Sequence, residues 1–386
     1  MLRVLTLSTL FPDATRPNFG IFVQRQTQEL AARSDVELEV IAPLGLPPGP
    51  LKLHPRYRAL SALPLQECWN GLIVHRPRFP LIPIIGQRYS AALLASALRP
   101  LVRKIGERFP FDMIDAQFFW PDGPAAARLA REFGVPFSIK ARGADIHHWG
   151  KQPSCAKQIV DAGKAANGLL AVSAALKADM AALGLAEEAI RVHYTGVDLE
   201  RFRPSDRQAA KSALGVAGPL LLSVGHLIER KGQGIAIDAM RTLPDATLLI
   251  VGEGPMRPAL EARIAAAGLG RRVRLLGAIA HEALPELYGA ADVMVLPAAS
   301  EGLANVWVEA LACGTPIVTT DVGGARELVD RLAAGRLVPR EADAIAAAVR
   351  DLLVAPPAHA EVRAAAERFT WKANGDALYE HLAGLR

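Results

Sequence analysis

The sequence predicts an α/β protein with two doubly wound domains, each built on a parallel sheet that helices cover on both faces. At 386 residues the chain is too long for one ordinary core. Short runs rich in Val, Leu and Ile alternate with helical patterns along the whole length, which is typical of parallel strands buried on both faces. A polar stretch at residues 196–212, with Pro204, is typical of a linker. We therefore expect domains at residues 1–200 and 201–369, facing each other across a cleft.

The first half begins with a strand and continues in strand–helix units. Helices are expected after most strands, for example at 22–33, 123–133 and 174–183. Residues 88–109 predict a pair of amphipathic helices, broken or kinked near Pro100. The strands expected in this half are 3–9, 38–43, 112–117, 136–141, 168–173 and 190–196.

The second half repeats this rhythm and ends its strands in polar, glycine-rich turns. After one of these strands, the loop "AASEGLAN" leads into a helix that we expect to begin at Asn305 as N-cap and to end at Gly314. The strands expected here are 220–225, 246–252, 273–277, 292–297 and 316–320.

Composition excludes several classes of protein. No uncharged apolar run of about 18 residues appears, so a membrane-spanning helix is not expected. The N-terminus lacks a signal-peptide pattern, and the three scattered cysteines fit a reducing cytosol better than a disulfide frame or a metal knuckle. The expected location is the cytoplasm.

Positive charge is concentrated in residues 51–110, which hold ten Lys and Arg and two Glu, so 10 − 2 = +8. Aromatic residues are interleaved with these charges. Such a surface could lie on an anionic membrane, or it could only keep an exposed face soluble, and the sequence leaves both readings open. Nucleic acid is not an expected partner, because no recognised binding motif accompanies the charge.

Ligands of doubly wound sheets bind at the carboxyl ends of the strands, where turns lead into helix N-termini. Arg230 and Lys231 open one such glycine turn and are well placed to neutralise a pyrophosphate. Glycines in these turns could instead serve only to let a strand turn into a helix.

Two glutamates, Glu301 in the loop and Glu309 in the following helix, could bracket a nucleotide sugar. Their carboxylates would accept hydrogen bonds from sugar and ribose hydroxyls, and the intervening amides would face phosphate. The alternative is that Glu309 only favours the helix dipole. The intervening amides are those of Leu303, Ala304 and Asn305.

Several motifs resemble one enzyme family over residues 3–383. "SEGLANVWVEALACGTPIVTTDVGGARELV" resembles the E-x7-E signature of retaining GT-B glycosyltransferases, specifically glycosyltransferase family 4. "LSVGHLIERKG" resembles its phosphate-binding strand and loop, "HYTGVDLERFRP" its interdomain segment, and "FTWKANGDALYEHL" its final helix, which would return to the first domain over residues 370–386. "FGIFV" and the Pro121-Asp122-Gly123 pattern resemble a subset that includes exopolysaccharide and teichuronic acid transferases.

This resemblance implies the GT-B fold and roles for individual residues. Arg230 and Lys231 would hold the donor diphosphate, assisted by Gly20 and the amides around Leu303 to Asn305, and Gly302 would be a further donor contact. Glu301 would contact donor-sugar hydroxyls and Glu309 the ribose, while Arg142 and Asp145 would face donor or acceptor. Further implied donor contacts are Gly225, Gly277, Ala278, Ala304 and Asn305, and the implied catalytic residues are Glu301, Arg230, Lys231 and Asp122.

The sequence departs from the family pattern at three positions. His226 stands where Arg often follows the glycine, Thr195 stands where Asn is common, and Gln117 stands where a histidine often faces the reacting centre. Asp122 and His147 are nearby candidates to replace that histidine, although a histidine such as His147 more often has only a structural role.

The reaction implied by the resemblance is sugar transfer with retention, from a nucleotide diphosphate sugar to a glycan or polyprenyl-linked acceptor. No D-x-D pair appears, so we expect neither metal nor cofactor. A hydrolysing nucleotide-sugar epimerase and a nucleotide-sugar-binding protein without turnover are the alternatives. Attachment to the inner face of the cell membrane remains open at this point.

Overall fold

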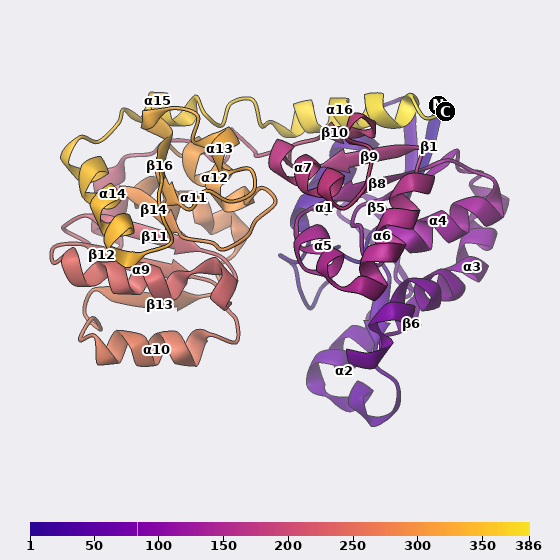
Figure 1. Ribbon diagram of the computed structural model, residues 1–386, viewed down its shortest axis with the longest axis horizontal. Helices are drawn as coiled ribbons and strands as arrows, with labels where there is room; N and C mark the ends of the chain where they lie inside the picture. Colours follow the sequence, from indigo (N-terminus) through magenta and orange to yellow (C-terminus); the bar gives the residue numbers. More distant parts are fainter. Residues whose placement is uncertain (83) are drawn as a thin grey trace. The chain divides into compact units, whose positions relative to one another are not determined.

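The computed structural model describes residues 1–82 and 84–386 and divides the chain into two compact units (Figure 1). The first unit joins Met1–Gly196 with Trp371–Arg386, and the second is the continuous segment Val197–Thr370. The sequence placed these boundaries after residues 200 and 369. Residue 83, in the basic segment 51–110, lies outside the described residues.

The first unit is built on an eight-stranded sheet with the order β10-β9-β8-β7-β1-β2-β5-β4. Its neighbouring strands are parallel except for β4 and β5, which form an antiparallel hairpin that the sequence pattern did not predict. The strands are β1 (Leu2–Leu7), β2 (Val36–Ile41), β4 (Gln66–Trp69), β5 (Leu72–His75), β7 (Met113–Ala116), β8 (Phe137–Ala141), β9 (Gly168–Ala171) and β10 (Ile190–Val192), and a separate small parallel sheet pairs β3 (Leu44–Leu46) with β6 (Arg78–Pro80).

Helix α3 (Ser90–Arg108) corrects the expected pair of helices, because it continues through Pro100 as one element. Pro100 lies on the exposed side, while Leu98 and Val102 on either side of it are buried. Packing of this apolar stripe outweighs the local cost of the proline. The other helices of the unit are α1 (Ile21–Ala31), α2 (Pro55–Ser61), α4 (Asp122–Phe133), α5 (Ala144–His147), α6 (Pro153–Ala165), α7 (Ala174–Ala182) and α16 (Trp371–Ala383).

Helix α16 belongs to the first unit although it is the last element of the chain. Leu378 and Leu382 are buried in one cluster with Leu2, Val4 and Met113. Its polar side is also fixed, because Arg33 on the first unit binds Asp376 at 2.9 Å. The sequence predicted this return of the last helix.

The second unit is built on a six-stranded parallel sheet with the order β13-β12-β11-β14-β15-β16. Numbered from its first strand, this is the 3-2-1-4-5-6 order of a dinucleotide-binding sheet. The strands are β11 (Leu220–Val224), β12 (Thr247–Val251), β13 (Val273–Gly277), β14 (Val293–Leu296), β15 (Ile317–Thr319) and β16 (Gly335–Leu337).

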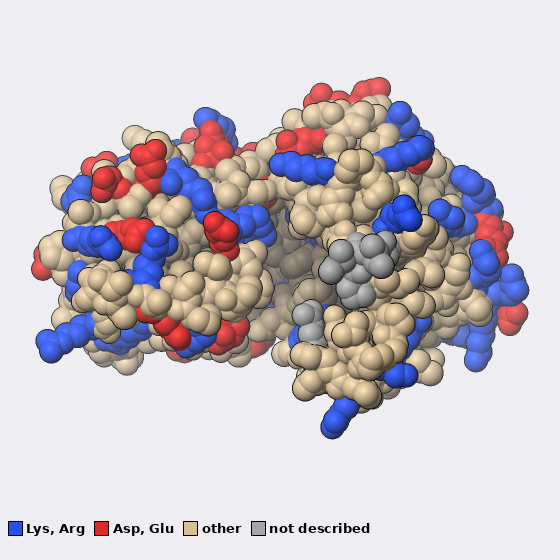
Figure 2. All heavy atoms as spheres, turned by 60° about the horizontal axis from the view of Figure 1, so that its bottom comes forward, with Lys and Arg blue, Asp and Glu red and all other residues tan. Residues whose placement is uncertain are grey.

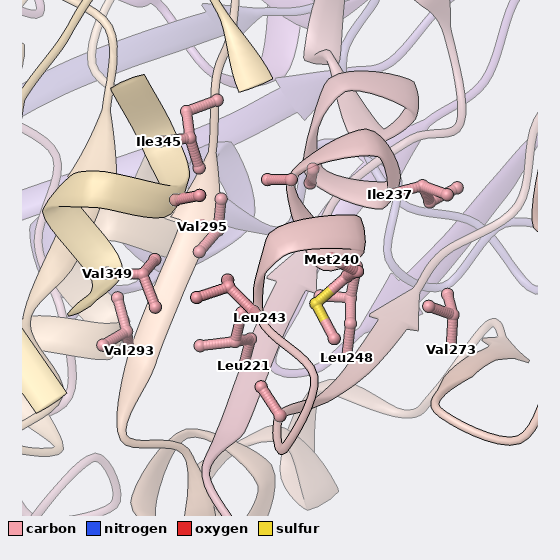
Figure 3. Packing of buried hydrophobic residues seen from close by; sticks show 14 of the residues in the cluster. Leu221, Ile237, Met240, Leu243, Leu248, Val273, Val293, Val295, Ile345 and Val349 are labelled. Carbon is pink, nitrogen blue, oxygen red and sulfur yellow. The ribbon is translucent and has the colours of Figure 1, made fainter. Parts of the chain in front are cut away.

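Helices cover both faces of this sheet, since right-handed crossovers to either side of the first strand place them on opposite faces. Figure 3 shows one face, where Ile237 and Met240 from the α9 region and Ile345 and Val349 of α14 pack on strand residues such as Val295. The helices are α8 (Arg207–Ala213), α9 (Gln233–Ala239), α10 (Arg257–Ala266), α11 (Leu284–Ala290), α12 (Asn305–Ala312), α13 (Ala325–Leu328), α14 (Ala342–Val354) and α15 (His359–Arg363).

The expected linker at 196–212 is shorter in the structure, because α8 already begins at Arg207. The side chain of Asp206 caps this helix by accepting a hydrogen bond from the Ala209 amide at 3.0 Å. Among the residues that the structure describes, no helix combines the length and apolar character needed to cross a bilayer.

Candidate functional site

The second unit has a ligand-binding position at the carboxyl ends of β11 and β14. These neighbouring strands lead into crossovers that run in opposite directions, and such a switch point leaves a crevice at the sheet edge. Arg230 and Lys231 follow β11, and Glu301 follows β14. The fold therefore brings together three of the residues that the sequence singled out.

These three side chains form a compact ionic group. One carboxylate oxygen of Glu301, Oε1, lies 2.7 Å from Lys231 Nζ and 3.2 Å from a guanidinium nitrogen of Arg230. Glu301 is 8% exposed, and Arg230 also donates to the carbonyl of Ser300. The sequence did not predict that both cations would contact this carboxylate. The shared Glu301 carboxylate holds the Arg230 and Lys231 side chains close together, and each cation keeps further N–H donors that are not used in this contact.

The loop after β14 ends at free backbone amides. The expected N-cap is one residue off: Ala304, with extended backbone angles, is the N-cap, and Asn305 is the first helical residue of α12. In the described ranges the amides of Leu303, Ala304 and Asn305 have no hydrogen-bond partner. Free amides at a helix start carry the positive end of the helix dipole and favour an anion.

Glu309 lies in the second turn of α12 and is held by two side chains. His281 Nε2 donates to its Oε1 at 2.8 Å, and the hydroxyl of Tyr288 donates to Oε2 at 3.0 Å. Glu309 is 8% exposed, so its carboxylate is oriented before any ligand binds. Burial, together with the nearby charge of Glu309, raises the pKa of Cys313 to about 12, and this thiol is inert. Neither His281 nor Tyr288 belongs to a motif that would have marked it in the sequence.

Close backbone packing explains some of the glycines. A Cβ atom at Gly323 would lie 2.1 Å from the carbonyl oxygen of Glu301, so glycine there allows its loop to rest on the Glu301 loop. Gly20 has φ of 72°, and a Cβ atom there would lie 2.5 Å from the Leu10 carbonyl. Glycine therefore has a packing role at these two positions, and its predicted role in ligand binding stays a prediction. Gly225 follows β11, and Gly277 ends β13 beside the exposed Ala278.

The first unit holds a buried polar network beneath the carboxyl ends of its strands. Gln117 is 0% exposed, and its Oε1 accepts from Gln26 Nε2 at 2.6 Å and from Arg142 at 2.5 Å. Lys140 Nζ donates to Gln26 at 2.7 Å and to His193 Nδ1 at 2.7 Å. Burial lowers the pKa of Lys140 well below its usual value and that of Arg142 to about 10. Gln117 is thus fixed inside the unit, and its side chain does not face solvent.

The two aspartates that the resemblance placed near substrate are both 0% exposed. Asp145 accepts hydrogen bonds from the amides of Phe119, Arg142 and Gly143, and so holds two loops together. Asp122 accepts from the Thr9 amide at 2.8 Å, while its second oxygen has no partner among the described residues. Burial raises the pKa of Asp122 to about 7. In this structure both carboxyl groups position loops and neither is open to a ligand.

His147, the other candidate to replace the family's histidine, is hydrogen-bonded through Nε2 to the carboxylate of Asp179 at 2.8 Å on the first unit. Within residues 1–82 and 84–386, no group of three or more His, Cys, Asp or Glu side chains is arranged to hold a metal ion.

A cavity of about 470 Å³ lies at the matching switch point of the first unit. Thr9 and Leu10 follow β1, Phe118 and Trp120 follow β7, and these two strands are neighbours with opposite crossovers. The lining is mainly aromatic and aliphatic, which suits an apolar ligand group. The sequence did not predict this cavity. Its lining also includes Arg16, Phe19, Tyr57, Leu60, Phe79 and Trp149.

Comparison with known proteins gives matches to both units. A family described as "Glycosyltransferase Family 4" matches residues 20–201, and one described as "Glycosyl transferases group 1" matches residues 204–369. A 2-deoxystreptamine glucosyltransferase of Streptomyces kanamyceticus is 31% identical over 349 residues, which cover 82% of this chain and 87% of that protein.

TuaC of Bacillus subtilis strain 168, named as a glycosyltransferase of teichuronic acid biosynthesis, is 28% identical over 361 residues, which cover 90% of this chain and 88% of the relative. Among solved structures, HepE of Anabaena in complex with UDP-glucose superposes over the full length of both chains with a TM-score of 0.76 at 22% identity. The structural likeness supports the two-domain fold.

Proposed function

We propose a reaction for this chain from the family to which it belongs, the GT-B glycosyltransferases of glycosyltransferase family 4. The chain transfers a hexose from a nucleotide diphosphate sugar to a glycan or lipid-linked acceptor. The proposed setting is the synthesis of a surface polysaccharide or glycolipid. The relative named for teichuronic acid biosynthesis supports this setting.

The observation that carries the proposal is the site at the switch point of the second unit. It combines two cations, a nearly buried carboxylate and a helix start with free amides, and each has a partner on a nucleotide sugar. Arg230 and Lys231 fit the diphosphate together with the amides of Leu303 to Asn305. Glu301 fits hydroxyls of the donor sugar.

Glu309 is proposed to bind the ribose. Tyr288 and His281 each use one of its carboxylate oxygens, and each oxygen keeps a further lone pair for a hydroxyl donor. The carboxylate therefore does not have to reorient when the nucleotide binds. Preorganisation of this kind raises affinity without adding a new contact.

The proposed reaction retains the configuration of the sugar and needs no metal. The bond between C1 of the sugar and the phosphate oxygen breaks, and a bond from C1 to the acceptor oxygen forms on the same face. The acceptor's proton passes to the departing phosphate, so the protein supplies no base. Arg230 and Lys231 stabilise the charge that develops on the leaving diphosphate. Asp122 and Asp145 are proposed to position the loops of the first unit.

The first unit is proposed to bind the acceptor in its aromatic cavity. An apolar cavity of about 470 Å³ is large enough for part of a lipid or for an aromatic group of an acceptor. A polyprenyl-linked glycan would combine such a group with a sugar. We place the enzyme in the cytoplasm, at the inner face of the cell membrane, where such an acceptor would be reached through the basic segment 51–110.

Donor binding tests the proposal most directly. Calorimetry with a panel of nucleotide diphosphate sugars, in the presence of EDTA, should find micromolar binding of one donor. Glu309→Ala should abolish this binding, whereas Glu286→Ala, an exposed glutamate on α11, should leave it unchanged. Binding that needs a divalent cation would overturn metal independence. Binding that is indifferent to Glu309 would overturn the site.

A further inference from the structure

Residues 47–66, which connect β3 to β4 and are called the excursion below, expose apolar side chains that nothing in their own unit covers. Leu51, Leu53 and Leu65 are 56%, 66% and 70% exposed. They are three of only nine large apolar side chains that are exposed in the part of the chain that the structure describes. All three lie within 15 residues of the chain, whereas the other six are spread over the remaining described residues, and this concentration singles out the excursion as a candidate contact surface.

Charge in this excursion has one sign. Residues 47–66, from the end of β3 to the start of β4, contain Lys52, Arg56 and Arg58 and no Asp or Glu. The side chains of Lys52 and Arg58 are exposed, and neither has an acidic partner in the described ranges. In Figure 2 the lobe formed by the excursion shows blue Lys and Arg atoms among tan ones, with no red carboxylates on the side in view.

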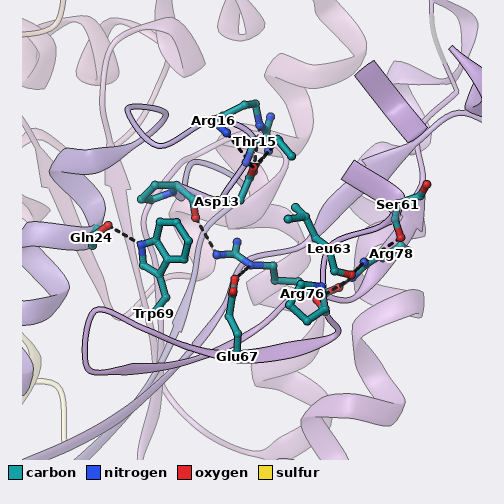
Figure 4. Close-up of polar contacts among 12 residues, drawn as sticks. Asp13, Thr15, Arg16, Gln24, Ser61, Leu63, Glu67, Trp69, Arg76 and Arg78 are labelled. Atoms are coloured by element: carbon teal, nitrogen blue, oxygen red, sulfur yellow. Dashed lines mark hydrogen bonds and ion pairs between the residues drawn. The ribbon is translucent and has the colours of Figure 1, made fainter. Parts of the chain in front are cut away.

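The excursion is held in place at its base. Arg78 in β6 donates hydrogen bonds to the carbonyls of Ser61, the last residue of α2, and Leu63, and Figure 4 shows both contacts. Arg76 is fully buried beside it and binds Glu67, the first acidic residue after the excursion. The exposed leucines are therefore presented on a fixed support.

The same excursion forms part of the aromatic cavity. Tyr57 and Leu60 of α2 line it, together with Phe79 of β6. The excursion that exposes Leu51, Leu53 and Leu65 on either side of α2 thus also contributes this short helix to the cavity proposed for an apolar acceptor group.

We infer that residues 47–66 form a membrane-contact element that inserts Leu51, Leu53 and Leu65 into an anionic bilayer surface, with Lys52 and Arg58 at the headgroups. This combination of apolar insertion and basic flanks is how interfacial segments bind anionic lipid. The inference rests on the proposed function, because a lipid-linked acceptor is what the enzyme would reach there.

This inference also limits the membrane contact to a part of the basic segment 51–110. Arg99 and Arg103 of α3 share Glu132 at 2.7 and 3.4 Å, so part of the charge of that helix is neutralised. The contact element is therefore the excursion and not the whole segment 51–110.

A fluorescent probe tests insertion in the full-length protein. Leu53→Cys, in a Cys68→Ser background, is labelled with a polarity-sensitive dye, and Leu332→Cys is the control because Leu332 is 78% exposed on the other unit. Vesicles of phosphatidylcholine with about one third phosphatidylglycerol should shift the emission of the Leu53 probe to shorter wavelength and leave the control unchanged. The same shift at both positions, or at neither, would overturn the inference.

Substitution tests the energetics. Leu51→Ser with Leu53→Ser should raise the lipid concentration for half-maximal binding at least tenfold, and so should Lys52→Glu with Arg58→Glu. Leu332→Ser with Val354→Ser, a pair on the other unit that is even more exposed, should not. Melting temperatures verify folding. Unchanged lipid binding in the first two variants would overturn the inference. It would also be overturned if the wild-type protein did not bind vesicles but formed a dimer, and if Leu51→Ser with Leu53→Ser dissociated that dimer.

Donor calorimetry on the same variants separates this inference from the proposed function. Nucleotide-sugar binding should be normal in all of them. A protein that binds vesicles through these leucines but binds no donor would contradict only the proposed function. A protein that binds and transfers sugar but ignores vesicles would contradict only the membrane contact.

Discussion

The carboxylate of Glu301 contacts both Arg230 and Lys231. Removing its charge should therefore affect nucleotide binding and the rate of sugar transfer differently, which shows whether Glu301 acts in binding or in the reaction. In Glu301→Gln the side chain keeps its size and loses its charge, so Arg230 and Lys231 are left to a phosphate alone. We expect the free nucleotide diphosphate to bind as well as before or more tightly. We expect kcat for sugar transfer to fall by about 10²-fold, because hydroxyl contacts and charge balance at the transition state are lost.

Calorimetry with the nucleotide diphosphate and initial rates of transfer measure the two effects separately. Glu229→Gln, an exposed neighbour of Arg230, is the matched control and should change neither. An equal loss of nucleotide binding and of kcat in Glu301→Gln would show that the carboxylate only holds the local structure.

Asp122 gives a prediction for stability against pH. Burial, aided by the negative charge of Asp145, raises the pKa of Asp122 from 3.8 in the unfolded chain to about 7. Between pH of about 4 and about 7 the folded protein therefore binds one proton more than the unfolded chain. The free energy of unfolding that this proton contributes is lost as pH rises through this range. Asp122→Asn mimics the protonated group, so its melting temperature should fall less between pH 5 and pH 8 than that of the wild type.

The control for this prediction is Asp161→Asn, an exposed carboxylate paired with Lys157 on α6. It should keep the pH dependence of the wild type. If Asp122→Asn shows the same fall as the wild type, the carboxyl is ionised in the folded protein at neutral pH, and the partnerless oxygen must have a cation or water partner.

Some site residues could be predicted from the sequence and others could not, for a physical reason. Glu301 and Glu309 lie close together in the chain and share a motif, so their spacing carried the information. Gln26 and Gln117 are 91 residues apart, and their hydrogen bond depends on how the fold brings helix α1 to the end of strand β7. Patterns of neighbouring residues in the sequence cannot predict contacts between residues so far apart in the chain.

At the scale of elements, long apolar runs were located well and short or half-exposed ones were not. The strands β11 and β12 are apolar except for Ser223 and Thr247, and they lie within the predicted ranges. The edge strand β4 alternates between exposed and half-buried residues over only four positions, and no pattern of that length distinguishes it from a loop. The start of α12 was displaced by one residue because Asn at the first helical position resembles Asn at the N-cap.

Helix α3 yields a prediction of its own. Pro100 removes one backbone hydrogen bond and crowds the preceding turn, while its ring lies on the exposed side. Pro100→Ala should therefore raise the free energy of unfolding by roughly 1–3 kcal/mol, since no buried contact is lost. Urea denaturation measures this change. Leu98→Ala, which removes a fully buried side chain two residues before Pro100, should instead lower it by about 2–5 kcal/mol.

At the scale of the whole molecule, the two units differ in how the chain builds them. The second unit is one continuous segment, Val197–Thr370, with its own six-stranded sheet and apolar core. The first unit is complete only with Trp371–Arg386, which begin 175 residues beyond Gly196 in the chain. The resemblance of the last residues to the family's final helix was the only sequence signal for this arrangement.

The last prediction follows from this difference. A fragment of residues 197–370 should fold alone, melt cooperatively and bind the nucleotide diphosphate, because its core and Arg230, Lys231 and Glu309 all lie within it. A fragment of residues 1–196 should aggregate or melt without cooperativity, since removing α16 uncovers the surface that Leu378 and Leu382 bury. Joining residues 371–386 to it through a flexible linker should restore folding, whereas the same joined chain with Leu378→Asp and Leu382→Asp should not. Circular dichroism melts and calorimetry measure both outcomes. A stable fragment 1–196 would mean that α16 adds little to the first core, and failure of fragment 197–370 to fold would mean that the two units depend on each other for stability.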